Sequence, residues 1–256
     1  MASNSNVIVS DVFVHLRTDR SVTQMMLENP CNADPSNIVC EDTLTGKTAT
    51  YGGLRADAFA AAHALRQRHG LVGGDTVTMI GRSQVDYILA THAVWAAGCV
   101  VNTVNHSSKP KEMLHALQIV KPRLLIVDVA VLDKVRRMLV DATLDIPVMT
   151  LVERVADTPL FPDDLLLDRN ARVDPSAFVL DGRNAQQVCA AVVLSSGTTG
   201  LPKAVMLSHH NLVSICEMLR AHNPDNWRGS QREIFFPPRE SIPTSDTTLA
   251  THTDLT

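Results

Sequence analysis

Short apolar runs alternate with amphipathic, helix-like segments along most of this chain. The alternation begins near Asn37 and continues to about Val152. Runs such as "RLLIVDV" are rich in branched apolar residues, which is typical of strands buried on both faces. Residues 51–70 instead place apolar side chains at helical spacing. This alternation predicts an α/β fold with a mostly parallel sheet and flanking helices.

Turn and capping residues mark where several of these elements should begin. Gly46 lies between "NIVCED" and "KTATY" and predicts the turn of a β-hairpin. Thr50 and Ser83 are suited to cap the helices that follow them. Ser208 or Asn211 should cap a helix further along the chain. The expected helices cover residues 51–70, 84–97, 109–120, 129–141 and the segment after residue 208.

The chain divides into three expected parts. These are an N-terminal extension over 1–34, a partial domain over 35–236, and a tail over 237–256. Within the domain, residues 153–187 are rich in Asp, Pro and Arg and predict an irregular connection, with "FVL" as its one candidate strand. The tail, "RESIPTSDTTLATHTDLT" from Arg239 onward, lacks periodicity and is expected to be disordered.

Composition excludes several classes of protein. Hydrophobic residues make up 45% of the 256 residues and the formal charge is −4, which favours a globular chain without a nucleic-acid partner. The cysteine count is odd, at five, and no pair has C-x-x-C spacing, which argues against a disulfide framework or a zinc site. The sequence shows no signal peptide, no membrane-spanning run and no peroxisomal C-terminal tripeptide, so a cytoplasmic location is expected.

The stretch "VVLSSGTTGLPKAV" combines a buried strand with a loop of small and hydroxylated residues. Glycines let the backbone approach an anion, hydroxyls donate to it, and a lysine supplies a compensating charge. The spacing is neither a Walker loop nor a dinucleotide fingerprint. An ordinary surface loop is the alternative, but phosphate binding is favoured. The candidate phosphate-binding residues are Ser195, Ser196, Gly197, Thr198, Thr199, Gly200 and Lys203.

The longer stretch "SSGTTGLPKAVMLSHHN" resembles the phosphate-loop signature of the adenylate-forming superfamily. That superfamily includes acyl-CoA synthetases and 4-coumarate-CoA-ligase-like enzymes. The order of elements upstream is similar too, so the resemblance covers roughly residues 35–236. One departure is Ala204, where the family usually has glycine, and its methyl group is expected to tighten or tilt the exit of the loop.

The resemblance implies a two-step ligase that uses ATP, Mg²⁺ and coenzyme A. A carboxylic acid and ATP would give an acyl-adenylate, and coenzyme A would then take the acyl group as a thioester. The loop over 195–203 would hold the β- and γ-phosphates, with Lys203 steadying the loop and its charge. The resemblance assigns no catalytic residue and no protein metal ligand in this chain. Aryl, fatty and polyketide-derived acids all remain open as substrates.

Two hypotheses about function remain. One is an acyl-CoA ligase by descent, in a biosynthetic pathway. The other is a truncated, non-catalytic nucleotide-binding remnant, or a subunit whose partner covers an exposed apolar face. The second is favoured for the chain acting alone, because the family's adenine, ribose and C-terminal lysine sites cannot be matched here. For His209, just after the loop, a capping or packing role is favoured over a phosphate or acyl-pocket role.

Overall fold

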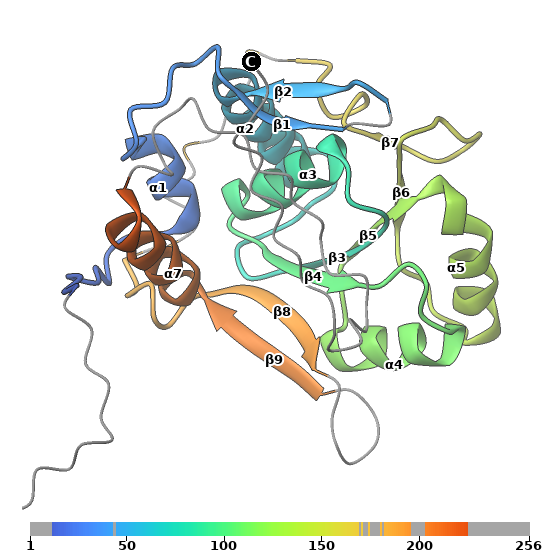
Figure 1. Ribbon diagram of the computed structural model, residues 1–256. Helices are drawn as coiled ribbons and strands as arrows, with labels where there is room; N and C mark the ends of the chain where they lie inside the picture. The colour runs from blue at the N-terminus through green and yellow to red at the C-terminus, as the bar shows by residue number, and fades with distance from the viewer. Residues whose placement is uncertain are drawn as a thin grey trace, which may run out of the picture.

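A single large sheet organises the chain. The computed structural model describes residues 12–42, 45–168, 170, 174, 180, 182–195 and 203–224. Within these residues the sheet has seven strands in the order β7-β6-β5-β3-β4-β8-β9 (Figure 1). Its strands are β3 (Thr76–Ile80), β4 (Val100–Val104), β5 (Leu124–Asp128), β6 (Val148–Leu151), β7 (Leu160–Phe161), β8 (Cys189–Ser195) and β9 (Lys203–Ser208).

The sheet is parallel except at one edge. Strands β3, β4, β5, β6, β7 and β8 all pair in parallel, whereas β9 pairs antiparallel with β8. The prediction of a mostly parallel α/β sheet is therefore confirmed. The carboxyl ends of the parallel strands lie along one edge, where such folds place their binding loops.

Helices cover both faces of the sheet. Helices α2 (Tyr51–Gln67) and α3 (Val85–Ala96) pack on one face, and α4 (Pro110–Val120) and α5 (Val129–Asp141) pack on the other (Figure 1). Successive side chains of a strand point to opposite faces, so β5 contributes Ile126 to the first cluster and Leu125 to the second. In the described part of the chain, no helix is long and apolar enough to cross a membrane.

The capping predictions have mixed outcomes. Thr50 caps α2 as expected, and Ser208 caps the helix that follows β9, α7 (His209–His222). Asn211 completes that cap, since its side chain accepts from the backbone N–H of Ser208 at 2.9 Å. The prediction for Ser83 is wrong, because α3 begins one residue later, after Gln84, whose side chain makes no capping hydrogen bond.

A buried acidic residue replaces the missing cap of α3. Asp86 lies in the first turn of α3, and its carboxylate accepts a hydrogen bond from Lys47 Nζ at 2.7 Å. A negative charge is favourable at a helix N-terminus, where backbone N–H groups lack partners. This contact also ties α3 to the hairpin of β1 (Ile38–Glu41) and β2 (Thr48–Thr50), whose turn contains Gly46 at φ +71° as expected.

Two elements were not anticipated from the sequence. Helix α1 (Val22–Glu28) lies within the expected N-terminal extension, and β7 lies within the expected irregular connection. The signal for α1 is present, because Ser21 and Gln24 form a capping box. Most of "FVL" and the whole tail over 237–256 lie outside the described residues.

A chain of buried polar groups crosses the middle of the sheet. The Thr78 hydroxyl on β3 donates to Asn102 Oδ1 on β4 at 2.8 Å. Asn102 Nδ2 then donates to the carbonyl oxygen of Val192 on β8 at 2.9 Å. Both polar side chains are fully buried, so each depends on the other for its hydrogen bond.

We expect Asn102→Ala to lower the free energy of unfolding by about 1–3 kcal/mol, because it leaves a buried hydroxyl and a buried carbonyl without this partner. Thr103→Ala is the matched control, since Thr103 is the next residue of β4 and is exposed. Its effect should stay within about 0.5 kcal/mol. Urea unfolding measures both, and equal effects of the two substitutions would contradict the assignment.

Candidate functional site

The two ends of the expected phosphate loop lie opposite each other. Ser195 is the last residue of β8, Lys203 is the first residue of β9, and the two are partners in the antiparallel register. The Ser195 hydroxyl lies 3.4 Å from the carbonyl oxygen of Lys203, to which it donates. Both residues are exposed. The other predicted site residues lie outside the described residues: Ser196, Gly197, Thr198, Thr199 and Gly200.

The hairpin of β8 and β9 diverges from the main sheet. Strand β4 pairs with β8 at Ala191 and Val192, and no further β4–β8 pairing occurs among the described residues. Burial falls in the same direction, from buried Ala190 to exposed Ser195. Figure 1 shows β8 and β9 running away from β4 toward the level of α4. The loop is therefore carried at the far end of a hairpin whose base pairs with β4, while Leu194 packs against the core and β9 contacts α4.

Two side chains missed by the sequence analysis anchor that base. Trp95 is half-buried and donates its Nε1–H to the carbonyl oxygen of Ala190 at 2.8 Å. Asn102 holds Val192 in the same way, as described above. The signal for Asn102 is a lone amide in the apolar run "CVVNTV", since a buried polar group needs a partner.

Ala204 fits the strand without distortion. It pairs with Leu194 in the β8–β9 register, and its backbone is not in the left-handed region. A residue in regular strand conformation accepts a methyl group without strain. Ala204 itself is thus unstrained, and the rest of the loop exit lies outside the described residues.

A charged pair lies at the same carboxyl edge of the sheet. Arg82, which follows β3, donates from Nε to the Asp128 carboxylate at the end of β5 at 3.0 Å. The other oxygen of Asp128 accepts from the backbone N–H of Ala130 and so caps α5. Burial alone would raise the pKa of Asp128, but these hydrogen bonds outweigh it and lower the pKa. Arg82 is thus a fixed, partly exposed cation at this edge.

The two histidines after the hairpin have structural contacts. His209 is 1% exposed, and its Nδ1 accepts from the backbone N–H of Val22 at 3.4 Å. Burial lowers the pKa of His209 to about 4, so the ring is neutral at pH 7. His210 Nδ1 lies 2.9 Å from the carbonyl oxygen of Arg17 and must therefore donate. A neutral, buried His209 fits the packing role and is unsuited to binding phosphate.

A match to a protein-family model shows which family the chain belongs to. The model is described as AMP-binding enzyme, and it matches residues 27–238. The chain belongs to the AMP-binding enzyme family. This family is the one that the loop sequence resembles, and the β8–β9 hairpin is the element that carries the resemblance.

The family includes curated relatives of known name. This AMP-binding chain is 30% identical to 4-coumarate--CoA ligase-like 3 of Oryza sativa subsp. japonica over 241 residues, which is 87% of the chain and 39% of the relative. It is 31% identical to 4-coumarate--CoA ligase 1 of the same plant over 188 residues, which is 72% of the chain and 32% of the relative. The chain thus spans less than half the length of these relatives.

Solved structures show the same fold. The luciferase-like enzyme from the nonluminescent mealworm Zophobas morio matches with a TM-score of 0.66 at 24% identity, over 80% of this chain and 47% of that one. ATP-bound MatB from Rhodopseudomonas palustris matches with a TM-score of 0.59 at 22% identity, over 79% of this chain and 37% of that one. Among the residues described here, no group of three or more His, Cys, Asp or Glu could hold a metal ion.

The buried His209 predicts a pH-dependent stability. The unfolded ring binds a proton below about pH 6.5, whereas the folded ring does so only below about pH 4. The stability contributed by the neutral ring is therefore complete above pH 6.5 and is lost as the pH falls toward 4. His209→Asn, which keeps an acceptor for Val22, should remove up to about 3 kcal/mol of this dependence.

Urea unfolding at several pH values between 7 and 4 measures this effect as the difference between the wild type and the variant. His222→Asn, an exposed histidine on the same helix, is the control and should leave the pH dependence unchanged. If the free energy of unfolding changed with pH in the same way for the wild type and His209→Asn, the buried ring would not resist protonation.

Proposed function

We propose that this chain binds the β- and γ-phosphates of ATP and thereby serves the activation of a carboxylic acid as an acyl-adenylate, which coenzyme A then converts to a thioester. The supporting observation is the pairing of Ser195 with Lys203 at the exposed end of the hairpin. That pairing places a hydroxyl and a lysine side by side at the two ends of the segment over 196–202. Membership of the AMP-binding family agrees with this role.

The chemistry explains why such a loop is needed. A carboxylate is a poor electrophile until one of its oxygens becomes part of a good leaving group. In the proposed reaction, that oxygen attacks the α-phosphorus of ATP, and the bond to pyrophosphate breaks. Donors fixed around the β- and γ-phosphates stabilise the negative charge that accumulates on pyrophosphate. When Mg²⁺ is bound to the nucleotide, it neutralises part of the same charge.

A second candidate is a nucleotide-binding part that further polypeptide must complete. Apolar side chains are exposed on neighbouring elements, β9 and α7, with Met206 the most exposed of them at 70%. The others in this group are Val205, Ile215, Met218 and Leu219. Exposed apolar side chains grouped on an element, such as Ile215, Met218 and Leu219 on α7, are typical of an interface. We propose that it accepts the remainder of an adenylate-forming domain, since the matched relatives are more than twice as long.

Lys203→Ala tests the phosphate-binding role. We expect the variant to bind MgATP about 10- to 100-fold more weakly, as is typical for loss of a hydrogen bond to a charged group of about 1.5–3 kcal/mol. Lys121→Asn is the matched control, because Lys121 ends α4 at the opposite edge of the sheet. Asparagine tolerates its left-handed backbone at φ +51°. Titration calorimetry measures both, and equal affinities for the two variants would refute the assignment of Lys203.

Pyrophosphate exchange separates the two candidates. We expect the chain alone to bind MgATP but to exchange pyrophosphate no faster than Lys203→Ala, because phosphate binding without the rest of the site does not position the acid. The assay uses a panel of aryl, fatty and polyketide-derived acids. Exchange that depends on one acid class and on Lys203 would instead show that this chain completes the site by itself.

A further inference from the structure

An N-terminal arm, defined as residues 17–22, holds the base of the hairpin. The carbonyl oxygen of Thr18 accepts from the backbone N–H of Ala185, just before β8, at 2.8 Å. The arm also contacts the first turn of α7, through Arg17 to His210 and Val22 to His209. The arm therefore touches the chain on both sides of the hairpin, where β8 is entered and where β9 is left.

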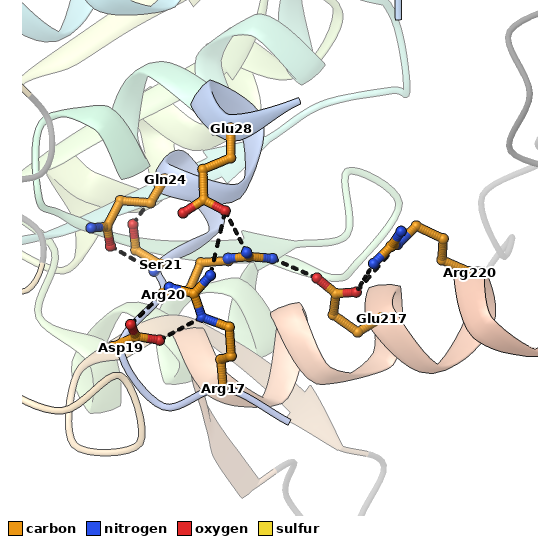
Figure 2. Close-up of polar contacts among 8 residues, drawn as sticks. All are labelled: Arg17, Asp19, Arg20, Ser21, Gln24, Glu28, Glu217 and Arg220. Carbon is orange, nitrogen blue, oxygen red and sulfur yellow. Dashed lines mark hydrogen bonds and ion pairs between the residues drawn. The ribbon is translucent and has the colours of Figure 1, made fainter. Parts of the chain in front are cut away.

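A buried arginine of the arm, Arg20, makes a further contact with α7. The side chain of Arg20 is 9% exposed, and its Nη1 donates to Glu217 Oε1 at 2.5 Å (Figure 2). Its Nη2 pairs with Glu28 at the end of α1. The second oxygen of Glu217 accepts from Arg220 Nη2 at 2.6 Å. A single guanidinium thus joins the arm and α1 to the middle of α7.

This contact fixes geometry more than it adds stability. Burying an arginine and a glutamate removes the hydration of both, and their attraction often does no more than offset that loss. The arrangement also leaves Arg20 Nε buried without a hydrogen-bond partner. Replacing a buried ion pair with apolar residues of similar size is often neutral for stability. What apolar residues lack is the directional pairing of one guanidinium with two carboxylates.

The base of the hairpin helps to set the position of Lys203, together with the contacts of Leu194 with the core and of β9 with α4. Strand β9 runs directly into α7 at Ser208, so the axis of α7 helps to set the direction of β9. A strand of this length spans about 20 Å at roughly 3.4 Å per residue. A rotation of about 5° at the base would move the far end of a rigid strand of this length by about 2 Å, unless the contacts with the core and α4 resisted it, and such a shift exceeds the tolerance of a hydrogen bond.

We propose that Arg20 is a positioning residue for the phosphate loop, acting through Glu217 and α7 on the direction of β9. The inference rests on the proposed function, because it assumes that the loop binds phosphate. It assigns a role in the nucleotide site to the N-terminal arm, which is remote from the loop in sequence and lies outside the β–α alternation. Arg20 acts through other residues and is not placed in contact with ATP.

Three variants separate positioning from stability. Arg20→Met removes the guanidinium, and the double variant Arg20→Met/Glu217→Met replaces the buried pair with apolar side chains. The double variant should unfold at a urea concentration close to that of the wild type. Val135→Ala is the control, because it creates a cavity in the core under α5, three strands from β8, and lowers stability there.

Titration calorimetry with MgATP gives the first readout. Both Arg20 variants should bind about fivefold more weakly or worse, which is the lower range of coupling between distant sites. Val135→Ala should bind as the wild type does. Recovery of full affinity in the stable double variant would overturn the proposal, and so would an equal loss of affinity in Val135→Ala.

Hydrogen exchange gives a readout that does not need a ligand. The backbone amides of β8 and β9 should exchange faster in both Arg20 variants than in the wild type and Val135→Ala. Unchanged exchange in the double variant would overturn the positioning role. Absence of MgATP binding by the wild type would count against the proposed function alone, and exchange would then still decide whether Arg20 fixes the hairpin.

Discussion

The side chain of Asn102 joins the core of the parallel sheet to β8, the strand that leads into the predicted phosphate loop. On one side lies the core of the parallel sheet, reached through the hydroxyl of Thr78. On the other side lies β8, reached through the carbonyl oxygen of Val192, at the last position where β4 and β8 are paired. Beyond this point β8 is paired with β9 but not with β4 among the described residues. The direction in which it carries the loop therefore depends on how firmly its base is held.

Much of the architecture follows from local sequence pattern. The run "RLLIVDV" predicts β5 because residues buried on both faces must be apolar, and α5 follows over the expected residues 129–141. The start of α3 could not be predicted in this way. Ser83 has a side chain that could cap a helix, yet the negative charge at the N-terminus of α3 comes from Asp86. The partner of Asp86, Lys47, is distant from it in the sequence. A two-residue strand such as β7 is too short to produce any periodicity.

In the candidate site, too, local features can be predicted from the sequence and long-range contacts cannot. The loop residues are predicted from the sequence because glycines, hydroxyls and a lysine stand together, and the ability to bind phosphate depends on that local composition. The contacts that hold the base of the hairpin could not be predicted from the sequence. Trp95, Asn102 and Arg20 act through partners about 90 to 197 positions away in the chain. No local pattern carries that information, because the pairing exists only once the sheet has formed.

The position of His209 in the sequence suggests one role, and its surroundings in the fold indicate another. A histidine directly after a phosphate loop suggests a ligand for an anion, and its sequence alone does not exclude that role. In the folded chain the ring is buried beside the N-terminal arm, and burial disfavours a positive charge on it. The same burial that makes the ring a poor phosphate ligand makes it a neutral hydrogen-bond acceptor for the arm. The N-terminal arm is thus joined to α7 by one ion pair and one buried neutral ring, in addition to the contacts of Trp95 and Asn102 with β8.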